Sequence, residues 1–210
     1  MNPLSEIGDL FKRSWQELVN DYANDAEENA YDGKETAESF PQSYWSEHDV
    51  KAQLYSVLVK ELKGKDIDSV HVECSLSPDL FGREDSTNRR LKRIRKILHK
   101  TPRVDILIDC QSPGRDESSW APLIAELKFF FALGKTNPMT KGRKDQIEEC
   151  RKDLKKLDTI KQCLGADTEV YFCLIDNLPR NHPEEKQTVL DDINGFEGVG
   201  KLTYFGPMMK

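Results

Sequence analysis

Two charged residues interrupt an otherwise apolar segment, PLIAELKFFF, at residues 122–131. Glu126 and Lys128 are separated by one residue, so in a β-strand both side chains leave the same face of the sheet. Burial of either charge is costly unless the charge is paired or coordinated. The segment therefore predicts either a simple buried Glu–Lys ion pair or a functional site that needs both charges.

A third charged residue favours the functional alternative. Asp105 interrupts the apolar segment RVDILID at residues 103–109, and it can come beside Glu126 if the two segments are paired strands. Two carboxylates held close together raise each other's proton affinity, so the arrangement is costly without a divalent cation between them. Mg²⁺ suits these ligands because it prefers hard oxygen donors and keeps water and substrate phosphate in its remaining positions. The sequence therefore predicts a magnesium site, with Mn²⁺ as an alternative ion.

The surrounding sequence shows which elements would position these residues. Ser46, with Asp49 three residues later, marks the start of a helix that ends near Gly64. The other expected elements are a strand at 70–76, a basic amphipathic helix at 89–100, strands at 103–109 and 122–131, a long helix at 142–165, and strands at 169–176 and 201–206. The first three strands are expected to be antiparallel neighbours. The fold class is thus α/β, with a mixed central sheet flanked by helices.

The first 46 residues differ in charge from the rest of the chain. They carry ten acids and three bases, net -7, whereas the remaining residues carry 27 acids and 28 bases, net +1. Residues 4–22 have helical spacing, and a polar, acidic segment typical of a linker follows them. We therefore expect an acidic N-terminal helical extension and linker at residues 1–45 and one domain with one active site at residues 46–210. The acidic total then does not exclude a local DNA-binding surface.

Composition and residue spacing argue against membrane-spanning, secreted, disulfide-bonded and zinc-binding proteins. No apolar stretch approaches the length needed to span a bilayer, and the start MNPLSEIGDLFKRSW lacks the pattern of a secretory signal. We therefore expect a cytoplasmic protein without a membrane partner. The five cysteines are odd in number and widely spaced, which predicts reduced, buried thiols. The four histidines have no partner at zinc-ligand spacing, so any metal should be held by oxygen.

The order of elements and the charged motif together resemble the PD-(D/E)XK nuclease superfamily, which has the restriction-endonuclease-like fold with an αβββαβ core. The resemblance covers about residues 46 to 176. Glu-x-Lys alone is a weak signal, and it becomes more specific with an upstream strand Asp and the order of elements. The proline of the motif is displaced, because Pro102 lies three residues before Asp105. A literal Pro78-Asp79 lies in a polar loop and is a minor alternative for the metal-binding aspartate.

The resemblance implies roles for the residues of the motif. Asp105 and Glu126 would bind the metal, and the main-chain carbonyl of Leu127 would be a further ligand. Lys128 would orient and help to deprotonate the attacking water, or stabilise the phosphate as charge develops on it. The implied activity is Mg²⁺-dependent hydrolysis of DNA phosphodiester bonds, as an endonuclease.

Four further polar residues are candidates for the same site. Glu47 shares a helical face with apolar residues, so it either joins the catalytic and metal-binding residues or only complements the helix dipole. Gln146 resembles a catalytic glutamine of some branches of the superfamily, although Cys150 replaces the tyrosine that accompanies it there. Glu73 is an extra ligand, a pairing partner or a solvent-facing edge residue. Asp109 is expected at a solvated strand end.

A run of bases precedes the strand that carries Asp105. Residues 89–103 contain eight Lys or Arg and no acid, which predicts phosphate contacts beside the metal, although a solvated helix face is the commoner meaning of such a run. A second basic group follows Phe131 in an expected loop. The candidate nucleic-acid-binding residues are Arg89, Arg90, Lys92, Arg93, Arg95, Lys96, Lys100, Arg103, Lys141, Arg143 and Lys144.

Two other functions are consistent with the same sequence. In the first, the chain is a nuclease-like subunit that binds DNA or a partner protein without cleaving. In the second, the acidic extension at residues 1–45 mimics DNA or blocks the basic surface. A homodimer would suit cleavage of both DNA strands, and no segment indicates its interface.

Overall fold

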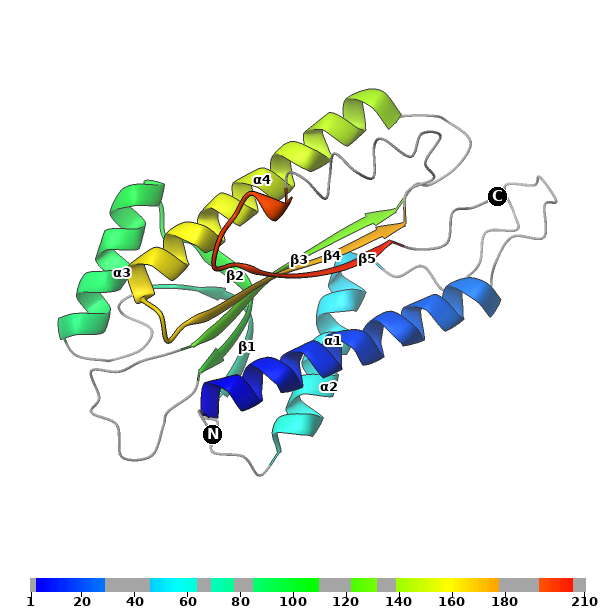
Figure 1. The fold of residues 1–210 in the computed structure, drawn as a ribbon, viewed down its shortest axis with the longest axis horizontal. Helices are drawn as coiled ribbons and strands as arrows, with labels where there is room; N and C mark the ends of the chain where they lie inside the picture. The colour runs from blue at the N-terminus through cyan, green and yellow to red at the C-terminus, as the bar shows by residue number, and fades with distance from the viewer. Residues whose placement is uncertain are drawn as a thin grey trace.

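The computed structural model describes residues 3–28, 46–63, 69–77, 85–109, 122–131, 139–177 and 193–205. These residues form four helices and five strands (Figure 1). The elements are α1 (Pro3–Glu28), α2 (Glu47–Leu62), β1 (Ser69–Ser75), α3 (Asp85–Leu98), β2 (Arg103–Asp109), β3 (Leu123–Phe131), α4 (Met139–Leu164), β4 (Glu169–Asn177) and β5 (Gly200–Phe205). None of the described helices is long and apolar enough to cross a membrane.

The five strands form one mixed sheet in the order β1-β2-β3-β4-β5. The pairs β1–β2 and β2–β3 are antiparallel, as the sequence predicts, whereas β3–β4 and β4–β5 are parallel. A parallel pair needs a crossover connection, and α4 supplies it between β3 and β4. The predicted α/β class with a mixed central sheet is therefore confirmed.

Helices cover both faces of this sheet, with α1 and α2 on one face and α3 and α4 on the other (Figure 1). Each face has its own apolar core. In β3, Ala125 and Leu127 contribute to the core under α1 and α2, while Ile124 and Phe130 contribute to the core under α3 and α4. This alternation places Glu126 and Lys128 on the α4 side of the sheet, as the period of two predicts.

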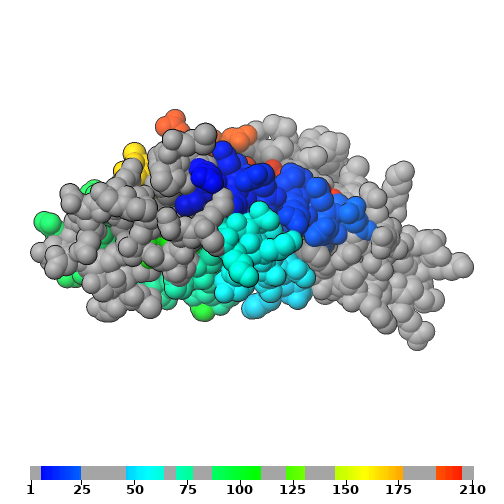
Figure 2. Space-filling model, turned by 90° about the horizontal axis from the view of Figure 1, so that it is seen from below, coloured from blue at the N-terminus to red at the C-terminus, as the bar shows by residue number. Residues whose placement is uncertain are grey.

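Helix α1 is part of the core of the described structure. It lies beside α2 on one face of the molecule (Figure 2), and Phe11 stacks on Tyr171 of β4 with ring centroids 5.2 Å apart. Its buried residues are Ile7, Leu10, Phe11, Trp15, Leu18, Val19 and Tyr22. The sequence assigns this helix to an extension, but its apolar face packs on the same sheet as α2. The acidic linker after it lies outside the described residues.

The start of α2 agrees with its sequence signal. The main-chain N–H of Asp49 donates to the Ser46 hydroxyl at 3.3 Å, and the main-chain N–H of Ser46 donates to the Asp49 carboxylate at 2.6 Å. The two bonds form a capping box. The Ser46 hydroxyl also donates to the Asp49 carboxylate at 2.7 Å, and this bond, together with the one from the main-chain N–H of Ser46, lowers the pKa of Asp49. Because this cap fixes the first turn, it also fixes the place of Glu47, the first residue of the helix.

Candidate active site

Strands β2 and β3 bring the two predicted carboxylates to the same level of the sheet. Their recorded register runs from Ile108 opposite Leu123 to Ile106 opposite Ala125. One step further, this register sets Asp105 opposite Glu126. There the Asp105 carboxylate accepts a hydrogen bond from the main-chain N–H of Leu127 at 2.8 Å, in the way that a main-chain carbonyl would in a regular ladder.

The neighbouring strand is distorted at the same level. Glu73 of β1 lies between Val72 and Cys74, which face Ile106 and Val104 of β2, so the register sets it opposite Asp105. Its φ is +51°, a left-handed conformation that costs a non-glycine residue about 1–2 kcal/mol. The Glu73 side chain pairs with Arg103 at 2.6 Å and with Lys51 of α2 at 3.4 Å. The distortion thus accompanies the meeting of β1, β2 and α2 at this site.

On the α2 side of the sheet, three carboxylates surround one lysine. The Lys51 ammonium lies 2.8 Å from Asp105, 2.9 Å from Glu47 and 3.4 Å from Glu73. Burial lowers the pKa of Lys51, but the hydrogen bonds to Asp105 and Glu47 and the charges of these two carboxylates together outweigh burial and raise the pKa above its ordinary value. We call these four residues the α2 cluster.

On the α4 side, two carboxylates alternate with two lysines. The Lys156 ammonium lies 2.7 Å from Glu126 and 3.0 Å from Asp153, and the Lys128 ammonium lies 3.1 Å from the other oxygen of Asp153. Lys156 also donates to the main-chain carbonyl of Arg103 at 3.2 Å, which connects α4 to the start of β2. We call Glu126, Lys128, Asp153 and Lys156 the α4 cluster.

Glu126 has the most perturbed carboxyl group of the two clusters. Its side chain is 4% exposed. Burial raises its pKa to about 8; the Lys156 ammonium opposes this shift, and the charges of Asp105 and Asp153 add to it. The charge of Asp105 therefore reaches the Glu126 carboxyl group. Burial lowers the pKa of Lys128, but the carboxylates of Asp153, Glu47 and Asp105 together outweigh burial, and the net pKa is raised.

The structure therefore joins the three motif residues in one charged site, but with partners that the sequence did not identify. Glu126 pairs with Lys156, and Lys128 pairs with Asp153, so the simple Glu126–Lys128 ion pair is not formed. The missed residues are Lys51, Asp153 and Lys156. A weak signal exists for each: Lys51 is four residues after Glu47, while Asp153 and Lys156 flank the buried Leu154 on α4.

The four additional candidates have different outcomes. Glu47 joins the α2 cluster, and its charge also contributes to the raised pKa of Lys128. Glu73 is a pairing partner, one of the three alternatives left open. The side-chain oxygen of Gln146 is buried without a hydrogen-bond partner among the described residues. The expectation for Asp109 is wrong: it is only 6% exposed, because β2 is an inner strand and even its last residue is covered.

The donor chemistry fits a divalent cation that takes few protein ligands. No three His, Cys, Asp or Glu side chains converge as a metal-binding group within the described parts of the chain. Asp105 and Glu126 offer hard carboxylate oxygens close enough for the charge of Asp105 to raise the pKa of Glu126, and the main-chain N–H of Leu127 donates to Asp105. One or two carboxylates are what Mg²⁺ usually takes from a protein. The Pro78-Asp79 alternative lies outside the described residues.

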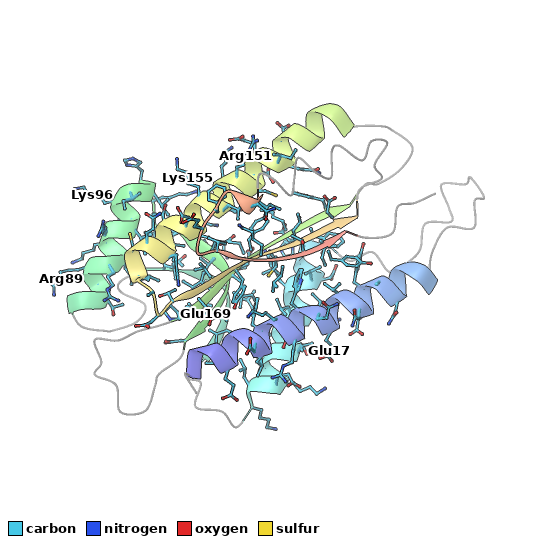
Figure 3. The ribbon with its side chains drawn as sticks, in the orientation of Figure 1. Glu17, Arg89, Lys96, Arg151, Lys155 and Glu169 are labelled. Atoms are coloured by element: carbon cyan, nitrogen blue, oxygen red, sulfur yellow. The ribbon has the colours of Figure 1, made fainter. Side chains whose placement is uncertain are left out.

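The basic helix α3 lies on the same side of the sheet as the α4 cluster. Arg89 and Lys96 project from α3, and Arg151 and Lys155 project from α4 on the same side, whereas Glu17 lies on the opposite helical layer (Figure 3). The exposed bases of α3 and the following turn are Arg89, Lys92, Arg93, Arg95, Lys96 and Lys100.

The other predicted nucleic-acid-binding residues are placed differently. Arg90 is half-buried and donates to the carbonyl of Leu164 at 2.9 Å. Arg103 is exposed but engaged with Glu73. Lys141, Arg143 and Lys144 were expected in a loop; they belong to the first turns of α4, which begins at Met139 because the helix continues through Gly142.

The expectation of reduced, buried thiols is confirmed for Cys150, Cys163 and Cys173, which are buried and form no disulfide with any described residue. Cys74 also forms no disulfide but is only half-buried, and Cys110 lies outside the described residues. Cys173 lies close enough to Asp105 and Glu126 for their charges to raise its pKa, although burial is the larger cause.

Comparison of the chain with models of protein families, with curated proteins and with solved structures finds no match.

Proposed function

We propose that this chain is a Mg²⁺-dependent nuclease that hydrolyses DNA phosphodiester bonds. The observation that carries the proposal is the meeting of Asp105, Glu126 and Lys128 in one charged site at the point where the pairing of β2 and β3 ends. Such a group of buried charges is costly to fold around, which argues for a role in chemistry.

The topology supports the same proposal. The order α2, three antiparallel strands, α4 and the parallel strand β4 agrees with the αβββαβ core of the restriction-endonuclease-like fold, with α3 inserted between β1 and β2. The resemblance of the sequence to PD-(D/E)XK nucleases rests on the same elements. A fold alone does not imply an activity, so cleavage is inferred from the residues of the charged site and not from the topology.

Each residue of the site has a distinct task in this proposal. Asp105 and Glu126 would hold the cation, and the main-chain carbonyl of Leu127 and the carboxylate of Glu47 would be further oxygen donors. When bound, Mg²⁺ would polarise the scissile phosphate and lower the pKa of a water molecule. The Lys128 ammonium, held by Asp153 at 3.1 Å, is available to orient the attacking water and to stabilise the negative charge that develops on phosphate.

The basic face of α3 supports a polyanionic substrate. Its exposed bases are not mixed with acids between residues 89 and 103, and they lie on the side of the sheet that carries Glu126 and Lys128. Such a surface binds phosphates without selecting a sequence. The described part of the acidic extension, α1, covers the opposite face of the sheet, so α1 does not lie over this surface (Figure 1).

One observation favours the second candidate, a nuclease-like subunit that binds DNA without cutting it. Both carboxylates of the metal site already have lysine partners, Lys51 for Asp105 and Lys156 for Glu126. The charge cluster is therefore compensated without a metal ion. A test must distinguish a site that cleaves from one that only retains compensated charges.

The test is nicking of supercoiled plasmid DNA by the purified protein in Mg²⁺, Mn²⁺ or EDTA. Glu126→Ala and Lys128→Ala should each reduce metal-dependent nicking by about a hundredfold or more. The matched control is Lys60→Ala, an exposed lysine of α2, which should leave nicking unchanged. DNA binding without any metal-dependent nicking of duplex, single-stranded or branched substrates would replace the nuclease by the binding subunit.

A further inference from the structure

We infer that Lys51 and Lys156 are internal counterions that a divalent cation must displace from Asp105 and Glu126. This inference rests on the proposed metal-dependent function, because it concerns the same two carboxylates. It adds that two lysines outside the predicted motif, one from each helical layer, determine how tightly the site binds its cation.

The geometry of the two ion pairs is the first argument. The Lys51 ammonium lies 2.8 Å from Asp105, and the Lys156 ammonium lies 2.7 Å from Glu126. A Mg²⁺ ion binds a carboxylate oxygen at about 2.0–2.1 Å. The cation and the ammonium would therefore compete for the same carboxylate oxygens, and their like charges would repel each other at short range.

Burial is the second argument. The side chains of Lys51 and Lys156 are 8% and 16% exposed, respectively, so neither ammonium lies free in solvent. Screening by water and salt is weak for such groups. The repulsion between each lysine and an incoming cation is therefore larger than it would be for a surface lysine such as Lys155.

Alternative acceptors make displacement feasible. Lys51 also contacts Glu47 and Glu73, and Lys156 also contacts Asp153 and the main-chain carbonyl of Arg103. Each ammonium can therefore shift away from the metal-binding carboxylate and keep a hydrogen-bonded partner. This arrangement opposes cation binding without preventing it.

The experiment measures Mn²⁺ binding by electron paramagnetic resonance in the absence of DNA and of oxygen, at pH 8.5, for the full chain. Lys156→Met and Lys51→Met should each bind Mn²⁺ about tenfold more tightly than the wild type, a coupling of ordinary size between two charged ligands. Lys156→Arg keeps the positive charge and should bind Mn²⁺ like the wild type. Lys155→Met, an exposed neighbour on the same helix, is the matched control and should not change the affinity.

The outcomes separate this inference from the proposed function. If the wild type binds Mn²⁺ and Glu126→Gln abolishes binding, but both Met variants match Lys155→Met, the inference is wrong and the metal site stands. If no variant binds Mn²⁺, the metal-dependent function fails, and the inference fails with it. Thermal melting checks that each variant is folded, and Lys156→Gln, which keeps a donor for Asp153, replaces Lys156→Met if that variant does not fold.

Discussion

The α2 cluster and the α4 cluster use the same residue types in different proportions. The α2 cluster has three carboxylates around Lys51, whereas the α4 cluster has two carboxylates and two lysines. They also differ in exposure, because the side chains of Asp105 and Glu126 are 15% and 4% exposed. The α2 cluster is thus the acidic half of the site and is partly open to solvent. The α4 cluster has equal numbers of acids and bases, and its Glu126 is nearly closed off from solvent.

This difference suggests a division of tasks within the proposed nuclease. The acidic half attracts a cation, because its three carboxylates exceed the combined positive charge of Lys51 and of Arg103, which pairs with Glu73. The balanced half holds Lys128 through Asp153 and keeps Glu126 in an environment that disfavours its charged form. Perturbed groups of this kind are concentrated at functional sites, although structural ion-pair networks also produce them.

The largest effect is expected for the stability of the metal-free protein as pH changes. An ordinary Glu titrates near 4.5, and folded Glu126 titrates near 8 because of burial. Between these two pH values the folded state binds more protons than the unfolded state, so the free energy of unfolding falls as pH rises. The stability that protonated Glu126 contributes is therefore fully present below pH 4.5 and is lost as pH rises through 8. Glu126→Gln should remove this loss, which is on the order of 3–5 kcal/mol.

The measurement is urea unfolding in EDTA at pH 5 and pH 8.5. The free energy of unfolding of Glu126→Gln should exceed that of the wild type at pH 8.5 and approach it at pH 5. Glu149→Gln, an exposed position on α4, is the control and should follow the wild type at both pH values. Parallel pH dependences for Glu126→Gln and the wild type would show that the closed half of the site does not disfavour the charged carboxylate.

The next effect concerns the link between Asp153 and Lys128. Asp153→Asn removes the charge that holds the Lys128 ammonium at 3.1 Å, so the turnover number on a short DNA duplex should fall about ten- to a hundredfold, with little change in KM. Asp153→Glu should restore part of the rate. Asp158→Asn, which affects an acid that accepts a hydrogen bond from Gln162 on the same helix, is the matched control. An equal loss in both Asn variants would indicate a general effect on α4.

Much of the fold could be predicted because periodicity and capping are local properties. The strand at 103–109 and the capped start of α2 agree with their sequence signals. The sequence predicts that α4 starts at Gly142, because glycine often marks a helix boundary. The helix instead begins at Met139 and continues through Gly142. The sequence predicts α1 as part of an extension, because an acidic segment follows it. Its aromatic and aliphatic face nevertheless packs in the core of the domain.

Apart from Glu47, which follows the cap of α2 and shares a helical face with apolar residues, the site was predictable only where its residues interrupt strands. Asp105, Glu126 and Lys128 stand out because charges are rare in buried strands. Lys51, Asp153 and Lys156 do not stand out, because Lys and Asp are common on helices and only the packing of α2 and α4 on the sheet shows which ones face the carboxylates. The distortion at Glu73 had no sequence signal, since it depends on contacts with Arg103 and Lys51 from other elements.

The smallest effect is expected for a substitution that tests whether the N-terminal cap of α2 positions the α2 cluster. Ser46→Ala removes the hydroxyl that caps the N–H of Asp49, and it should lower the free energy of unfolding by about 1 kcal/mol. Ser56→Ala, the same substitution at an exposed position inside α2, should not destabilise the protein, because alanine favours the helix interior. Because Glu47 lies in the first turn and Lys51 one turn later, fraying of this end should weaken Mn²⁺ binding in Ser46→Ala but not in Ser56→Ala. Equal Mn²⁺ affinities in the two variants would mean that packing on the sheet, and not the cap, positions the acidic half of the site.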